Sequence, residues 1–232
     1  MKRPFLSLAL LALVPAASCV FIVDGEGEWD WGSGFHHGPR YHGSGVLGTQ
    51  ERDVADFSGL TLETWARVEI TVGDAPSLRL EGDDNLLSHV QTAMHGSNLV
   101  IDMERGSFDW ERGLKIVVTT PHLTRVSIHG SGNVTATGVD AERFSAAISG
   151  SGDLSVVGRT GHLEASISGS GDLRLRGLEA ATVSVSISGS GDVRVHATDE
   201  LQVSISGSGD VRYTGDPRVR KGISGSGSVR RE

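Results

Sequence analysis

A seven-residue pattern centred on Gly-Ser-Gly recurs six times in the second half of this 232-residue chain. The copies begin at Ile128, Ile148, Ile167, Ile187, Ile205 and Ile223. Successive copies are 20, 19, 20, 18 and 18 residues apart. Self-similarity at a nearly constant period of this length is typical of solenoid proteins, in which each repeat forms one turn of a stack.

Apolar and polar residues alternate on both sides of each Gly-Ser-Gly. Leu201, Val203 and Ile205 precede the fifth copy at every second position, and Val211 and Tyr213 follow it. A period of two indicates strands with one apolar face. A single repeat cannot bury that face, whereas stacked repeats align like side chains in columns about 4.8 Å apart. The repeat therefore predicts an all-β, parallel β-helix with rungs of 18–20 residues, each made of two short strands joined at Gly-Ser-Gly.

The two glycines of each copy have a physical reason. A tight corner repeated in register needs backbone with positive φ and leaves little room for side chains between rungs. The competing architecture is a meander of antiparallel hairpins with Gly-Ser-Gly as each turn, but hairpins do not require this period. The predicted corner glycines are Gly130, Gly132, Gly150, Gly152, Gly169, Gly171, Gly189, Gly191, Gly207, Gly209, Gly225 and Gly227.

Charged residues recur just after the corners. Stacking would align them in two outward columns, where arginines offset a repulsion of about 1 kcal/mol between neighbouring carboxylates. This surface ladder comprises Asp153, Asp172, Asp192, Asp210, Arg174, Arg194, Arg212 and Arg230. Calcium binding is one interpretation of the Asp column. A calcium ion takes six to eight oxygen ligands, however, so we favour the interpretation that each Asp caps its turn through a backbone N–H.

The segment 51–120 precedes the repeat and also alternates like β-strands, for example at Val68–Val72 and Leu114–Val118. Residues 90–103 are expected to form a hairpin with its turn at Gly96–Asn98. Asp83–Ser88 is expected to form a single helical turn. We therefore divide the folded part into a β-rich N-terminal part over 51–120 and a repeat β-helix over 121–232.

Residues 1–18 have the layout of a secretory signal peptide. Lys2 and Arg3 precede the apolar run Phe5–Val14, which is too short to span a bilayer. The single cysteine, Cys19, follows directly. It is either the lipidated first residue of a lipoprotein, which we favour, or an incidental thiol after ordinary cleavage.

Residues 19–50 are rich in glycine and charge and lack an apolar period, which indicates a flexible tether. His36, His37 and His42 lie in this segment beside Trp29 and Trp31. Imidazoles can ligate zinc or copper, but nothing in the sequence would fix their geometry, so we predict a polar linker and no metal site.

The net charge and the missing catalytic motifs argue against two classes of function, nucleic-acid binding and catalysis. The chain has 29 acidic and 21 basic residues, a net charge of −8, which disfavours nucleic-acid binding. It contains no nucleophile elbow, zinc-protease motif or phosphate-binding loop, so we predict a non-enzyme without a cofactor.

The repeated ISGSGD, together with DFSGLTLETWARVEITVGD and EGDDNLL before it, resembles the autotransporter adhesin head domain family of bacteria, also called the head GIN domain family. The resemblance covers residues 53–229. It implies a right-handed parallel β-helix, a cell-envelope location and adhesion, and it carries over no catalytic residues.

We therefore expect an exported, adhesin-like interaction module in the periplasm or on the outer membrane or cell surface. Its partner would be an envelope glycan or protein, and it would touch the membrane only through a lipid anchor. One alternative is a β-helical enzyme that processes polysaccharides. Another is a structural envelope protein that self-associates into a homo-oligomer through the open end of the β-helix.

Overall fold

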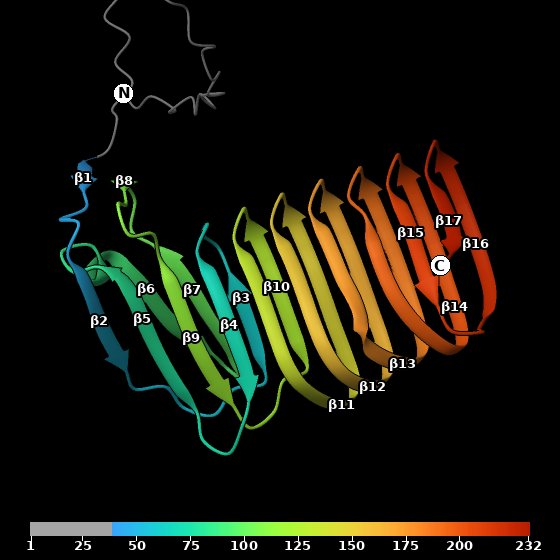
Figure 1. Cartoon of the computed structure of the whole chain (residues 1–232), viewed down its shortest axis with the longest axis horizontal. Coiled ribbons are helices and arrows are strands. Elements are labelled where there is room, and N and C mark those ends of the chain that lie inside the picture. The colour runs from blue at the N-terminus through green and yellow to red at the C-terminus, as the bar shows by residue number, and fades with distance from the viewer. Residues whose placement is uncertain (1–38) are drawn as a thin grey trace, which may run out of the picture. The chain divides into compact units, whose positions relative to one another are not determined.

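The computed structural model describes residues 39–232, which form a β-solenoid of about five turns. The predicted signal peptide, Cys19, and the histidines at 36 and 37 lie outside the described residues. Each turn has an entry face, whose strands run into the corner, and an exit face, whose strands leave it (Figure 1). Within residues 39–232, no helix is long and apolar enough to cross a membrane.

Four long strands carry the repeat and bend from the exit face to the entry face. They are β11 (Asn133–Gly150), β12 (Asp153–Gly169), β13 (Asp172–Gly189) and β14 (Val193–Gly207). The pairing register shifts where each strand bends, for example between Thr137 and Val139. The difference in rung length, 18 to 20 residues, is absorbed at these bends, so that the corners stay aligned.

The other strands extend the two faces. On the entry face the order is β6 (Val90–His95), β7 (Asn98–Met103), β3 (Gly59–Leu62), β10 (Arg125–Gly130), β11 to β14, and β16 (Arg218–Gly225). On the exit face it is β2 (Leu47–Arg52), β5 (Ser77–Asp83), β9 (Lys115–Thr120), β4 (Arg67–Val72), β11 to β14, β15 (Asp210–Thr214) and β17 (Ser228–Arg231). A separate pair joins β1 (Arg40–His42) to β8 (Ser107–Asp109).

The register confirms the stacked β-helix and excludes the hairpin meander. The six repeat isoleucines pair in sequence, each with its equivalent in the next rung, and all these strands run parallel. Ile128, Ile148, Ile167, Ile187 and Ile205 are at most 2% exposed. The isoleucine column is therefore the core of the stack, as the period-two pattern predicts.

Corners lie directly on corners. The backbone N–H of Ser151 donates to the carbonyl oxygen of Gly130 at 2.9 Å, and the same bond recurs up to Ser226 and Gly207. The first glycine has positive φ, 141° at Gly150. At the second glycine there is no space, because a Cβ on Gly171 would lie 2.1 Å from the carbonyl oxygen of Gly152. Only glycine fits both positions.

The N-terminal part of the stack does not follow chain order. The rung formed by β3 and β4 lies between the rung of β7 and β9 and the rung of β10 and β11. Leu62 pairs with Ile128 and Arg67 with Asn133, so residues 63–66 occupy the place of a Gly-Ser-Gly corner. That corner contains Trp65 where the others have serine.

Local expectations for residues 51–120 hold in most places. The antiparallel pair β6 and β7 confirms the hairpin, and η1 (Leu87–His89) provides one helical turn close to the expected one. The structure differs from the tether prediction at residues 40–50, where β1 and most of β2 lie. The reason is tertiary: β2 pairs antiparallel with β5, and the Arg52 guanidinium reaches the carbonyl oxygens of Leu87 and Val90 across the end of the stack.

The last described rung carries charge in the apolar columns. Lys221 pairs with Val203, which is 2% exposed, and Arg231 pairs with Tyr213. Charged residues at inward positions of an edge strand oppose pairing with another sheet edge. The same rung also exposes Val219 and Ile223, at 37% and 40%.

The corner stacking predicts a large difference between two Gly→Ala substitutions. Gly171→Ala forces a Cβ against backbone and is expected to lower the free energy of unfolding by about 3 kcal/mol. Gly222→Ala meets no atom within 4 Å and is expected to change it by less than about 0.5 kcal/mol. Urea unfolding followed by circular dichroism measures both, and equal losses would contradict the corner geometry.

Candidate functional site

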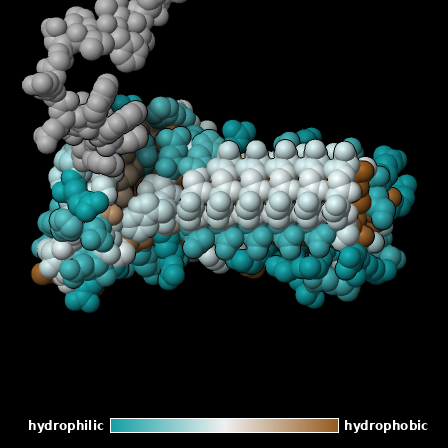
Figure 2. All heavy atoms as spheres, turned by 90° about the horizontal axis from the view of Figure 1, so that it is seen from above, coloured by the Kyte–Doolittle hydropathy of each residue, from teal (hydrophilic) through white to brown (hydrophobic). Residues whose placement is uncertain are grey.

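The corner edge of the solenoid presents two columns of exposed serines. Ser149, Ser168, Ser188, Ser206 and Ser224 pair with one another across successive rungs. The second column consists of the middle serines of the six corners, Ser131, Ser151, Ser170, Ser190, Ser208 and Ser226, and every member of both columns is exposed. We call this edge the corner face. Figure 2 looks down on it and shows a flat, regular array along the stack.

The corner face is rigid because the backbone beneath it is fully engaged. From Ser151 to Ser226, the backbone N–H of each middle serine donates to a glycine carbonyl oxygen of the preceding rung. The backbone that carries each exposed hydroxyl is therefore held in place. Neighbouring rungs are about 4.8 Å apart. A hydroxyl both donates and accepts hydrogen bonds. The face therefore offers polar groups at constant spacing, with glycine between them and little side-chain entropy to lose on binding.

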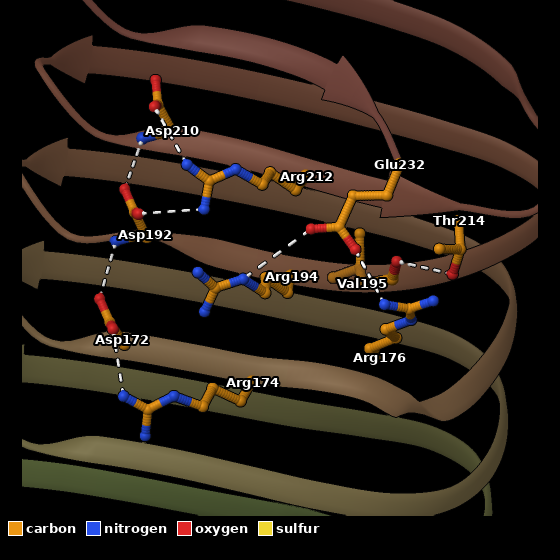
Figure 3. Close-up of polar contacts among 10 residues, drawn as sticks. All are labelled: Asp172, Arg174, Arg176, Asp192, Arg194, Val195, Asp210, Arg212, Thr214 and Glu232. Atoms are coloured by element: carbon orange, nitrogen blue, oxygen red, sulfur yellow. Dashed lines mark hydrogen bonds and ion pairs between the residues drawn. The ribbon is translucent and has the colours of Figure 1, made fainter.

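The Asp column lies beside the corner face, and its carboxylates accept hydrogen bonds from the protein's own backbone. The Asp172 N–H donates to Asp153 Oδ1 at 3.3 Å, and the Asp192 N–H donates to Asp172 Oδ1 at 3.2 Å. In the same way, the Asp210 N–H donates to Asp192 Oδ1 at 3.1 Å (Figure 3). Each of these carboxylates thus accepts the backbone N–H of the next rung, so the bond joins two rungs, whereas the expected cap lay within one turn. Within residues 39–232, no three His, Cys, Asp or Glu side chains group in a way that could hold a metal ion.

The Arg column neutralises part of the Asp column. Arg174 bridges Asp153 and Asp172 at 3.0 and 3.3 Å. Arg212 stands between Asp192 and Asp210 at 3.7 and 3.8 Å. These side chains are partly exposed, and exposed ion pairs contribute at most about 1 kcal/mol each. These ion pairs are individually weak, but together with the N–H bonds to the carboxylates they join neighbouring rungs.

Two arginines depart from this pairing. Arg194 lies 4.0 Å from Glu232, whose carboxylate also accepts from Arg176 at 3.0 Å (Figure 3). Arg230 pairs in register with Arg212 in the last described rung. The arginine column is thus continuous, although its partners change along the stack.

A shallow hollow of about 460 Å³ lies where the corner face meets the N-terminal rungs. Its lining includes Leu47, Trp65, Arg67, Arg112, Lys115 and Asn133. Trp65 is 43% exposed and contacts Trp110 edge to face, with ring centroids 5.9 Å apart. Sequence reasoning missed this site because Trp65 lies in a corner without the repeat motif. Aligning residues 62–67 with the repeat would have marked Trp65 as an outward corner residue.

The model of the protein family described as "Putative auto-transporter adhesin, head GIN domain" matches residues 56–217. The chain belongs to this family. The match covers both the N-terminal rungs and most of the Gly-Ser-Gly repeat, and it confirms the resemblance seen in the sequence. No match is found among curated proteins.

Solved structures share the fold of this head GIN domain. A protein from Bacteroides fragilis described as a "putative adhesin" is 21% identical, with a TM-score of 0.70 over 83% of this chain and 100% of its own. A "putative adhesin" from Parabacteroides merdae is 19% identical, with a TM-score of 0.56 over 83% of this chain and 99% of its own. A "putative lipid binding protein" from Parabacteroides distasonis is 22% identical, with a TM-score of 0.53 over 84% of this chain and 100% of its own. At these identities the likeness concerns the fold.

The Asp column predicts a pH dependence that can be measured at Asp210. The Ser228 hydroxyl, 2.8 Å from Oδ1, and then the Ser228 N–H lower the pKa of Asp210. Because the folded-state pKa lies below the unfolded value of about 3.9, the carboxylate stabilises the fold above that pH. This contribution disappears as the pH falls through the folded-state pKa.

We therefore expect Asp210→Asn to reduce the acid sensitivity of the head GIN domain, by at most about 1 kcal/mol. Urea unfolding at a series of pH values from neutral to acidic measures the difference. Asp74→Asn, at an exposed carboxyl group, is the control and should leave the pH profile unchanged. An Asp210→Asn profile parallel to that of the parent chain would contradict the assignment.

Proposed function

We propose that this head GIN domain is a non-catalytic adhesion module of the bacterial cell envelope and that it binds an envelope glycan or protein through the corner face. The observation that supports this most directly is the pair of exposed serine columns in register over successive rungs. Family membership supports an adhesin-like role at the envelope or surface.

The geometry of the corner face suits a repetitive ligand. Each rung offers the same groups at the same spacing, so a polymer with its own repeat can make many weak contacts at once. Such contacts add through effective concentration, because the first binding event positions the next one. The rigid backbone keeps the entropy cost of binding low.

The same geometry argues against a catalytic role. Covalent catalysis by serine needs one hydroxyl placed beside a base that is itself oriented by a third group. The middle serines of the corners instead lie between glycines, and both serine columns repeat the same hydroxyl group from rung to rung. The corner face thus repeats one chemical group many times, whereas an active site gathers different groups in one place.

Binding by the corner face can be tested with two arginine substitutions. Ser170→Arg and Ser190→Arg place large side chains on adjacent rungs of the flat array and are expected to lower retention on envelope material at least tenfold. Thr198→Arg in the bend of β14, at the opposite edge, is the control. Sedimentation of the purified mature chain with isolated envelopes measures retention.

A panel of envelope polysaccharides incubated with the parent chain serves as the assay for catalysis. Sugar released by the protein would overturn the non-catalytic assignment. Equal retention of the corner-face and Thr198→Arg variants would overturn the role of the corner face.

We further propose that Cys19 is acylated and anchors the protein to a membrane. Its place after a signal-like segment and a run of small residues supports this. We expect Cys19→Ser to move the protein from the membrane fraction to the soluble fraction and to abolish labelling by a fatty-acid analogue. An unlabelled parent protein in the membrane fraction would contradict acylation.

A further inference from the structure

We propose that the hollow beside Trp65 is a saccharide site that takes an acidic sugar, such as a uronic acid unit of an envelope glycan. The inference rests on the proposed adhesion function and adds a ligand class and an anchor point to it. The site lies at one end of the corner face, where the rung of β3 and β4 replaces the Gly-Ser-Gly corner.

Trp65 is the first indication of a ligand. It occupies the position that the repeat corners give to serine, and it is 43% exposed. A corner needs only small residues, so an exposed indole here has no role in forming the turn. Its edge-to-face contact with Trp110, at an interplanar angle of 75°, fixes the ring. A fixed, exposed indole presents a flat apolar surface on which the C–H face of a sugar ring can pack.

The charges around Trp65 indicate an anionic group on that ligand. Arg67 and Arg112 line the hollow, and no carboxylate in residues 39–232 forms an ion pair with either. The other two charged residues that line the hollow do have partners: Lys115 pairs with Glu69 at 2.8 Å, and Glu81 pairs with Arg79. Two unpaired guanidinium groups beside an aromatic surface can bind a carboxylate with charge-assisted hydrogen bonds.

The rim of the hollow is held by buried polar contacts. Asp83 is fully buried and accepts the N–H groups of Gly45 at 2.8 Å and Arg112 at 2.9 Å. The Arg112 side chain also donates through Nε to the Gly45 carbonyl oxygen at 2.7 Å. The EGDDNLL segment therefore ties together loops that are far apart in sequence. Asp83 thereby positions the backbone of Arg112, and Gly82 of the same segment lies against the Trp110 ring, so the site is preorganised.

The surface continues from the hollow toward the repeat. A second depression of about 240 Å³ shares Arg67 and Asn133 with the first and is also lined by Asp153, Ser155 and Arg174. Along this column the residue after the corner changes from Arg67 to Asn133 and then to aspartates. An extended glycan would thus place its acidic unit at Trp65 and neutral units farther along the stack. A peptide is less suitable, because peptide recognition needs pockets for alternate side chains, and the corner face is flat (Figure 2).

Binding of digalacturonate and of neutral maltose, the shortest oligomers, to the full mature chain tests the proposal, by calorimetry at low and moderate salt. We expect the acidic oligomer to bind and the neutral one to bind at least tenfold more weakly. Trp65→Ser, which installs the residue of the other corners, should reduce binding of the acidic oligomer at least tenfold, while circular dichroism shows that the β-solenoid remains folded. Trp65→Phe should keep most of the affinity. Arg67→Gln should weaken binding severalfold and reduce its dependence on salt.

The matched control is Thr198→Arg, in the bend of β14 at the edge opposite the corner face, which should leave the affinity for the short acidic oligomer unchanged. Equal binding by the parent and Trp65→Ser chains, or no binding by the parent, would overturn the site. Equal binding of acidic and neutral oligomers would overturn the choice of ligand. Envelope retention that persists in Trp65→Ser but is lost in the Ser170→Arg and Ser190→Arg variants would leave the proposed function standing without this site. The reverse pattern would support the site and overturn the role of the corner face.

Discussion

The close approach of one corner to the next is the contact on which the rest of the molecule depends. A serine N–H bonds to the glycine carbonyl oxygen of the rung below at 2.9 Å, and the second glycine of each corner has no room for a Cβ. Once the corners are stacked, the strands on either side must run parallel and in register. That register places the repeat isoleucines in one buried column and the serines in exposed columns.

The proposed binding surface is a direct consequence of this packing. Glycine is required because the rungs are close, and residues between glycines can only point outward. The repeat therefore makes a flat edge with hydroxyl groups at strand spacing, and this edge needs no additional element to become a contact surface. Residues 63–66 take the place of a Gly-Ser-Gly corner without its two glycines, and the surface beside Trp65 in that corner is hollowed.

The charged ladder has a different role from that of the serines. Its aspartates accept backbone N–H groups of the next rung, and two of its arginines, Arg174 and Arg212, each bridge two aspartates. These contacts use the polar atoms within the protein, so fewer remain for a ligand. The repeated charge is therefore best understood as part of the stack, while Arg67 and Arg112, outside the ladder, remain available.

Much of the fold could be predicted from the sequence, because each copy of the repeat contains the two glycines and the alternating apolar residues that a stacked corner requires. The period, the alternation around Ile167 or Ile205 and the two glycines together required parallel rungs, and the hairpin at residues 90–103 followed from local pattern. The tertiary structure alone decided the order of the N-terminal rungs, since the rung of β3 and β4 is inserted between two others that come later in the chain. It also decided the pairing of β2 with β5, and it brought Trp65, Arg67 and Arg112 together. The reason is that a repeated local pattern encodes its own neighbours, whereas contacts between unlike segments depend on backbone pairing over long sequence separations, which no single segment specifies.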